Sequence, residues 1–260
     1  MSTTTTIHAT PRIAIVTGGS RGLGKSTALN LAKQGVDVIL TYNAQAAHAQ
    51  AVVSEIEAMG RKAVALQLNV AHSSSFAAFA EQVRAALQTH WNTGVFQVLV
   101  NNAGTGLHVS LMEATEAQFD EMVNVHFKST FFLTQKLLPL MADGGRIVNL
   151  SSGLTRFAFP GYGVYASMKG AVETLTKYMA KELGPRGIAV NVVAPGAIAT
   201  DFSGGAVRDN AQLNAMLSAQ TALGRVGQAE DIGPMIAALV SSDNRWVNAQ
   251  RIEVSGGMML

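Results

Sequence analysis

Short apolar runs alternate with segments of helical periodicity along the chain, and this alternation constrains the fold more than any other feature. The runs are rich in β-branched residues and apolar on both faces, which is typical of parallel strands covered by helices on both sides. They lie at residues 13–16, 36–41, 63–68, 96–100, 146–150, 188–193 and 251–254. The pattern predicts an α/β fold of the Rossmann type, with a doubly wound parallel sheet of about seven strands.

The helical segments lie between these runs, and no repeat or low-complexity linker divides the chain. They are expected at about 22–34, 44–59, 73–88 and 115–138, and around Tyr165 as far as Gly184. The chain has 260 residues, enough for one sizeable core, so residues 11–260 are expected to form a single domain after a flexible tail at 1–10. The segment 201–225 is rich in Gly, Ala and Asn, and we expect it to be an irregular lid over the substrate.

Composition argues against several classes of function. The net charge is only +2 and the basic residues form no run, so no nucleic-acid partner is expected. The chain has no cysteine and its six histidines include no pair at zinc spacing, so no metal site is expected. No apolar stretch approaches the ~18 residues of a membrane span, and the N-terminus does not resemble a secretory signal. We therefore expect no membrane association and a cytoplasmic location.

A glycine-rich turn follows the first apolar run and opens the first helix, with the sequence Thr17-Gly18-Gly19-Ser20-Arg21-Gly22-Leu23-Gly24. The turn fits two phosphate-binding templates. Residues 19–26 match the Walker A pattern of P-loop nucleotidases letter for letter. In the other template, Gly18 makes the tight turn of a dinucleotide site. Gly22 and Gly24 then let a pyrophosphate approach the free N–H groups of the helix N-terminus.

Magnesium coordination separates the two templates. A P-loop nucleotidase needs a carboxylate at the end of another apolar strand to help hold the ion. The candidate strand ends carry no Asp or Glu, since they read Gln67-Leu68-Asn69, Val100-Asn101-Asn102 and Asn149-Leu150-Ser151. This favours the dinucleotide turn and keeps the P-loop nucleotidase as a rival hypothesis.

Tyr165 and Lys169 stand four residues apart in a predicted helix, so both side chains share one helical face. A nearby ammonium favours phenolate, and we expect Lys169 to lower the pKa of Tyr165 from its ordinary ~10 toward a value useful in acid–base catalysis. Ser151 and Ser152 end an apolar run a short distance upstream. Together with the glycine turn, these residues indicate chemistry on a carbonyl or alcohol beside a bound dinucleotide.

Several motifs in register resemble the short-chain dehydrogenase/reductase family in its 250-residue form, from about Ile13 to Gly257. They are the glycine turn, Asn101-Asn102-Ala103-Gly104, the set Ser152, Tyr165 and Lys169, Asn191-Val192-Val193-Ala194-Pro195-Gly196, and Val254-Ser255-Gly256-Gly257. The resemblance implies an oxidoreductase that transfers hydride between a nicotinamide cofactor and a carbonyl or secondary alcohol. It also implies a homotetramer whose interface is formed by the two long helices.

The resemblance assigns roles to individual residues. Tyr165 would exchange a proton with the substrate oxygen, Ser152 would orient that oxygen, and Lys169 would hold the nicotinamide ribose. Asn124 would hold a water in a proton relay to Lys169. Tyr165 and Lys169 would also contact the cofactor, together with Gly18, Ser20, Arg21, Gly22, Leu23, Gly24, Tyr42, Asn69, Val70, Asn102, Ala103, Gly104, Pro195, Gly196, Ile198 and Thr200.

The end of the second strand bears on the choice of cofactor. NAD-preferring members carry an acid there to bond the ribose 2′-hydroxyl, whereas this chain has Tyr42-Asn43. Arg21 lies in the glycine turn, where NADP-preferring members of the family often place a basic residue. NADP(H) is therefore predicted as the preferred cofactor, with NAD(H) possible. Asn69 stands where the family often has Asp, so its bond from the adenine amino group would lack charge assistance.

The substrate is expected to be a small or medium ketone, aldehyde or secondary alcohol. Phe157 suggests an apolar wall, His108 is a candidate to face the substrate, and Arg156 is a candidate partner for an anionic group. A 3-oxoacyl-[acyl-carrier-protein] reductase is the alternative. Arg186 would suit its acidic partner, but Asp143 brings an acid where a basic residue would help. A non-catalytic dinucleotide sensor is a rival from another class, marked by a missing Ser, Tyr or Lys, and none is missing.

Overall fold

The computed structural model describes residues 11–260, and seven parallel strands form one sheet in the order β3-β2-β1-β4-β5-β6-β7. The strands are β1 (Ile13–Val16), β2 (Asp37–Tyr42), β3 (Ala63–Gln67), β4 (Phe96–Asn101), β5 (Met141–Leu150), β6 (Ala189–Pro195) and β7 (Arg251–Val254). The predicted doubly wound parallel sheet is confirmed. The strand order reverses between β1 and β4, so loops leave in opposite directions there and open a crevice at the carboxyl ends. The tail expected at residues 1–10 lies outside the described residues.

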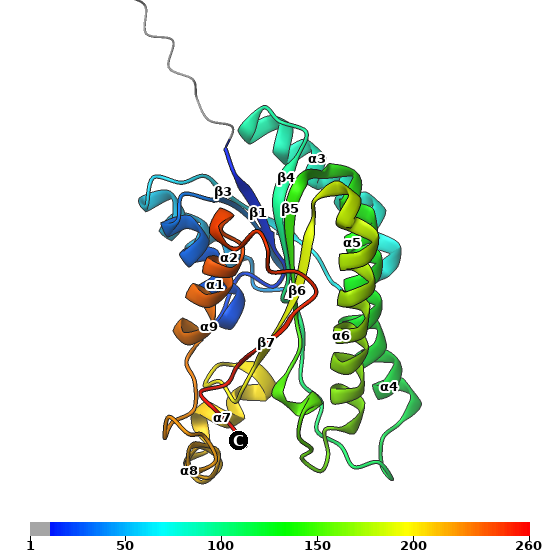
Figure 1. Ribbon diagram of the computed structural model, residues 1–260, viewed down its shortest axis with the longest axis vertical. Helices are drawn as coiled ribbons and strands as arrows, with labels where there is room; N and C mark the ends of the chain where they lie inside the picture. Colours follow the sequence, from blue (N-terminus) through cyan, green and yellow to red (C-terminus); the bar gives the residue numbers. More distant parts are fainter. Residues whose placement is uncertain (1–10) are drawn as a thin grey trace, which may run out of the picture.

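Helices cover both faces of the sheet (Figure 1). One face carries α1 (Gly22–Lys33), α2 (Ala46–Ala58) and α9 (Ala229–Leu239), and the other carries α3 (Phe76–Trp91), α5 (Ser129–Leu137) and α6 (Gly163–Leu183). The sequence analysis did not name α9, a helix that carries Pro234 in its interior. Within the described part of the chain, no helix is both long and apolar enough to cross a membrane.

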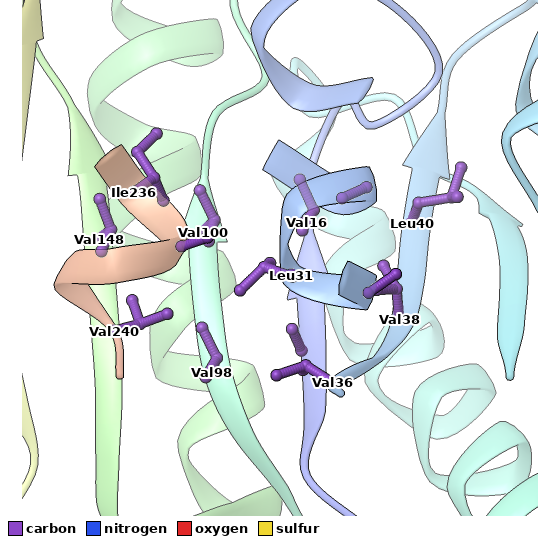
Figure 2. Packing of buried hydrophobic residues seen from close by; sticks show 14 of the residues in the cluster. Val16, Leu31, Val36, Val38, Leu40, Val98, Val100, Val148, Ile236 and Val240 are labelled. Carbon is purple, nitrogen blue, oxygen red and sulfur yellow. The ribbon is translucent and has the colours of Figure 1, made fainter. Parts of the chain in front are cut away.

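Valines from neighbouring strands form the core beneath α1 and α9, as Figure 2 shows. Val16 and Val100 are fully buried and pack with Leu31 of α1 and Ile236 of α9. Each such side chain contributes roughly 1.5–3 kcal/mol on burial. This packing fixes β1 beside β4, and so fixes the positions of the loops that leave their carboxyl ends.

The helix predicted at 115–138 is divided in the structure. It runs as α4 (Glu116–Met122), a π-helical turn (Val123–Lys128) and α5. Ser129 and Thr130 donate their side-chain hydroxyls to the carbonyls of Val125 and His126, at 2.5 and 2.7 Å. Such bonds compete with the helical ladder, and π-turns frequently accompany functional sites. The extra residue in this turn changes which side chains face the cleft.

The segment predicted as an irregular lid at 201–225 is largely helical. It contains a short turn (Phe202–Gly205), α7 (Ala206–Asp209) and α8 (Ala211–Ala219). Asn210 caps α8, accepting the Leu213 N–H at 3.0 Å. Figure 1 shows α7 and α8 beyond the carboxyl ends of the strands, where a ligand of this fold would lie.

Candidate active site

A cleft of about 1290 Å³ lies at the carboxyl ends of the strands. Segments that follow β1, β2, β3, β4, β5 and β6 line it, together with α7, α8 and the C-terminal Met258. Ligand pockets usually hold roughly 300–1,000 Å³. The cleft therefore has room for two molecules side by side, a dinucleotide and a substrate.

The glycine turn is held against the end of β4 by hydrogen bonds. Thr17 Oγ1 accepts the N–H groups of Asn102 and Ala103, both at 2.9 Å, and Asn102 Nδ2 donates to the Thr17 carbonyl at 2.8 Å. A Cβ at Gly24 would lie 2.1 Å from the Gly18 carbonyl oxygen, so α1 approaches the turn as closely as a helix can. Two separate motifs thus build one rigid edge of the cleft.

The N-terminus of α1 fits a pyrophosphate. No side chain caps this helix end, and a helix leaves its first N–H groups without intrahelical partners. Gly22 has a φ of 53°, which a residue with a side chain rarely adopts, and Gly24 offers no Cβ. Uncapped N–H groups with the positive end of the helix dipole favour a phosphate at this place. Arg21 also lines the cleft, 3.8 Å from the Asp201 carboxylate.

Ser152, Tyr165 and Lys169 meet at the other side of the cleft, where β5 and α6 come together. Tyr165 and Lys169 are only 7% and 6% exposed. Lys169 Nζ donates to the Leu150 carbonyl at 2.9 Å and lies 5.6 Å from the centre of the Tyr165 ring. Ser152 Oγ accepts the Leu154 N–H at 3.2 Å, which leaves its hydroxyl proton available to a substrate oxygen.

Burial dominates the protonation of this set. It raises the pKa of Tyr165 well above the ordinary value, with the Ser152 hydroxyl acting in the opposite direction. Lys169 is not among the causes of this shift, so its predicted lowering of the pKa of Tyr165 stays a prediction. Burial also lowers the pKa of Lys169 to about 8. Near pH 7 the site thus holds a protonated phenol beside an ammonium that is still mostly charged.

Asn124 is not brought to this set. It lies in the π-helical turn and is not among the described residues that line the cleft, whereas His126 is. Two positions along a helix rotate a side chain by roughly 200°, so these two residues face opposite ways. His126 is the side chain of this turn that reaches the cleft, and the sequence analysis did not name it. The available signal was the spacing of four from Met122 to His126, which places both on the buried face.

His126 packs its ring edge-on against Tyr165, with centroids 5.2 Å apart and planes at 89°. Its Nε2 lies 2.8 Å from the Thr105 carbonyl oxygen. A carbonyl only accepts, so Nε2 carries the hydrogen and Nδ1 is left as an acceptor. Nδ1 is buried and has no hydrogen-bond partner among the described residues. Burial, with the charge of Lys169, lowers the pKa of His126 to about 2, so the ring stays neutral.

Of the three predicted substrate residues, two line the cleft and one does not. Phe157 and His108 line the cleft, and the His108 ring lies edge-on to Tyr162 at 4.9 Å. Arg156 does not line the cleft. Its guanidinium donates twice to Glu253 at 2.8 Å and once to the Met259 carbonyl at 2.8 Å. The prediction that Arg156 meets an anionic group is wrong, because Glu253 already neutralises it.

Every residue predicted to contact the cofactor lines the cleft. Arg186, the basic residue suggested for an acyl-carrier partner, lies elsewhere. It pairs with Asp143 at 2.8 Å and donates to the Leu138 carbonyl, near the start of β5. That position is at the opposite edge of the sheet from the carboxyl ends of the strands.

Comparisons with known proteins agree with this geometry. Residues 18–259 match a family model described as enoyl-(acyl carrier protein) reductase. A 3-oxoacyl-[acyl-carrier-protein] reductase FabG of Staphylococcus aureus is 39% identical, over 95% of this chain and 98% of its own.

Two solved structures extend the comparison. The angucycline C-6 ketoreductase LanV with bound NADP has a TM-score of 0.91 and 35% identity, with 95% of each chain covered. A short-chain dehydrogenase/reductase from Serratia marcescens has a TM-score of 0.88 and 33% identity, covering 97% of this chain and all of that one. The Walker A interpretation of the glycine turn is therefore wrong. This chain belongs to the short-chain dehydrogenase/reductase family, whose oxidoreductase activity it shares.

Proposed function

We propose that this protein reduces a ketone or aldehyde with NADPH, using Tyr165 as the proton donor. One observation carries the proposal: Ser152, Tyr165 and Lys169 lie in the same cleft as a glycine-lined, uncapped helix end. When bound there, a reduced nicotinamide supplies the hydride, while the protein supplies position and charge.

Tyr165, Ser152 and Lys169 each have a separate role in the proposed reaction. Because burial keeps Tyr165 protonated, its hydroxyl gives a proton to the carbonyl oxygen as negative charge develops on it. Ser152 donates a hydrogen bond to the same oxygen and orients it. The Lys169 ammonium, aimed by the Leu150 carbonyl, stabilises the phenolate that forms. In the oxidation direction the same groups work in reverse.

His126 occupies the cleft in place of Asn124, which the sequence analysis expected to hold a water in a relay to Lys169. Its ring fixes one edge of the Tyr165 phenol, and its Nδ1 offers a buried acceptor in the cleft. Because the ring stays neutral, it does not compete with Lys169 as a second positive charge.

NADP(H) is the proposed cofactor in preference to NAD(H). Tyr42 and Asn43 line the cleft at the end of β2, so no carboxylate stands where a 2′-phosphate would lie. Arg21 lines the same end, and the related LanV structure holds NADP. The ratio of kcat/KM for NADPH to that for NADH tests this, and a value below one contradicts it.

A 3-oxoacyl-[acyl-carrier-protein] reductase remains the second candidate, favoured by the similarity to FabG. The charge around the cleft does not favour it. Among the described residues lining the cleft, Arg21 and Lys169 are the only Lys or Arg side chains, and Lys169 is buried. Turnover of acetoacetyl-acyl carrier protein faster than that of free ketones would establish this candidate instead.

We also propose a homotetramer. Aromatic side chains are exposed along the face of α4, α5 and α6, where Phe119 is 45%, Phe131 39% and Tyr178 64% exposed. Such a surface favours contact between copies of the chain. Sedimentation at micromolar concentration tests this, and a monomer would refute it. A cytoplasmic location stays a prediction from the sequence, which fractionation of the source cell tests.

A binding and turnover experiment tests the proposed reductase. NADPH fluorescence should change on titration with the protein, whereas ATP with Mg²⁺ should not bind. Carbonyl-dependent loss of absorbance at 340 nm should then follow. Binding of NADPH with no turnover across a broad carbonyl panel would contradict the proposed function.

A further inference from the structure

The part of the cleft beyond Tyr165 is walled by apolar side chains from three distant segments of the chain. Phe157 comes from the loop after β5, Leu213 and Leu217 come from α8, and Met258 comes from the C-terminus. These residues belong to one apolar cluster, in which Met258 is only 2% exposed. Residues far apart in the sequence thus pack together to form an apolar chamber beside the proton donor, Tyr165.

Aromatic rings are the main feature of this chamber. Phe157 and Phe159 stack edge to face at 5.4 Å, and both line the cleft. On the side of the lid, the Phe202 ring lies 5.9 Å from the Tyr165 ring, and Met216 is 45% exposed nearby. Aromatic faces and methionine sulfur both favour a flat aromatic ligand over a small aliphatic one.

Among the described residues, those that form the apolar wall of this chamber include no Lys or Arg. Arg156 is neutralised by Glu253, and Arg208 of the lid donates to both Asp201 and Asp209. Glu121 lines the cleft and adds a negative charge. A carboxylate or phosphate on the substrate would therefore lose its hydration without gaining a partner, which is costly.

We infer that the substrate is an uncharged ketone on a fused aromatic ring system. The inference rests on the proposed function and narrows it. The ketone gains a hydride at its carbonyl carbon, with NADPH as the reductant, and the Tyr165 proton at its oxygen, giving a secondary alcohol. Phe157, Leu213 and Met216 supply the surface against which the ring system packs, while His108 and Tyr162 supply polar edges at the same end.

Two matched pairs of ketones test the ring system and the charge separately. 2-Tetralone should exceed cyclohexanone in kcat/KM by at least ~30-fold, since the fused ring adds several buried carbons. Ethyl benzoylformate should exceed benzoylformate by a similar factor, because only the second carries a carboxylate. Equal or inverted values in either pair would overturn the inference.

Variants then locate the effect in the chamber. Met216→Ala should lower the ratio of 2-tetralone to cyclohexanone at least ~5-fold, as expected for loss of an apolar contact. Met216 is partly exposed, so this variant should fold; Phe157→Ala provides a second case. Met59→Ala is the control, since Met59 is 39% exposed but does not line the cleft. An unchanged ratio in both chamber variants would contradict the assignment.

A binding measurement separates failure of the inference from failure of the proposed function. Calorimetry on protein saturated with NADP⁺ should give a Kd for 2-tetralol at least ~10-fold below that for cyclohexanol, with a negative heat-capacity change. If no ketone is reduced, the proposed function fails, and the two Kd values still decide the inference. If cyclohexanone is reduced as well as 2-tetralone, the function stands and the inference fails.

Discussion

The two ends of the cleft are built in different ways. The cofactor end uses backbone: glycines, an uncapped helix and the hydrogen bonds that tie Thr17 to Asn102. The substrate end uses side chains from segments far apart, such as Phe157 and Met258. The cofactor end is formed by short contiguous sequence motifs. The substrate end is formed by residues that come together only when the chain folds.

A network of ion pairs and hydrogen bonds connects the segments that form the substrate end. Glu173 of α6 accepts from Thr155 at 2.7 Å and from Arg251 at 2.8 Å. Arg251 also donates to Glu253 at 3.0 Å, and Glu253 in turn holds Arg156. The loop that carries Ser152 is thereby tied to α6, to β7 and to the C-terminus. We expect substitutions at the substrate end to leave the cofactor end largely unaffected. Substitutions at the cofactor end should disturb the substrate end more.

The largest expected effect lies where the two ends meet. Tyr165→Phe should lower kcat at least ~100-fold, because a positioned proton donor is lost. The NADPH Kd should stay within about threefold, since the phenol is not part of the glycine-lined helix end. Fluorescence titration and steady-state kinetics on one preparation measure both. Near-normal turnover would remove Tyr165 from the proposed chemistry.

Gly24→Ala tests the cofactor end alone. The new Cβ would meet the Gly18 carbonyl oxygen at 2.1 Å, so the turn must shift. Overpacking of this kind costs about 1–3 kcal/mol, and the NADPH Kd should rise ~10- to 100-fold. Gly94→Ala is the matched control, because nothing lies within 4 Å of its Cβ position. If both variants bind NADPH normally, the helix end is not the phosphate site.

Glu173→Gln tests the substrate end. It removes a charge that holds Arg251, whose guanidinium also donates to the Ser152 carbonyl at 3.3 Å. Hydrogen bonds to charged groups contribute about 1.5–3 kcal/mol, so the free energy of unfolding should fall by about 2 kcal/mol and kcat/KM should fall with it. Glu81→Gln should change neither, because its pair with Arg84 is exposed. An effect confined to NADPH binding would contradict the proposed division of the cleft.

The last prediction concerns the pH dependence of stability, and it depends on His126. Its pKa is lowered to about 2 in the folded state, while the unfolded chain takes up a proton near ~6.5. Protons therefore favour the unfolded state, and stability falls as pH drops below ~6.5. Between pH 6 and 4, His126→Asn should lose less stability than the wild type, by up to about 1.4 kcal/mol per pH unit. Parallel curves in urea unfolding would show that His126 is not buried and neutral.

The same division explains what could be predicted from the sequence. The sheet followed from apolar runs, and the cofactor end followed from glycines in register with Asn102, since both depend on local geometry. The resemblance that suggested Asn124 did not predict the π-helical turn at Val123–Lys128, in which His126 and not Asn124 lines the cleft. Arg156 failed because its partner Glu253 lies on a strand far along the chain.

The pKa of Tyr165 also could not be predicted from spacing. A separation of four along a helix predicts a shared face, but not how deeply that face is buried. In the folded protein, burial raises the pKa of Tyr165 and keeps the phenol protonated. That outcome suits a proton donor, which is the role of Tyr165 in the proposed function.

Isotope transfer tests the central claim most directly. The wild-type protein would be mixed with 2-tetralone and NADPH carrying deuterium at the transferred C4 position, and the alcohol examined by mass spectrometry and NMR. The proposed function predicts one deuterium on the carbinol carbon of the product. A product without deuterium, or loss of NADPH with no alcohol formed, would contradict hydride delivery to a carbonyl in this cleft.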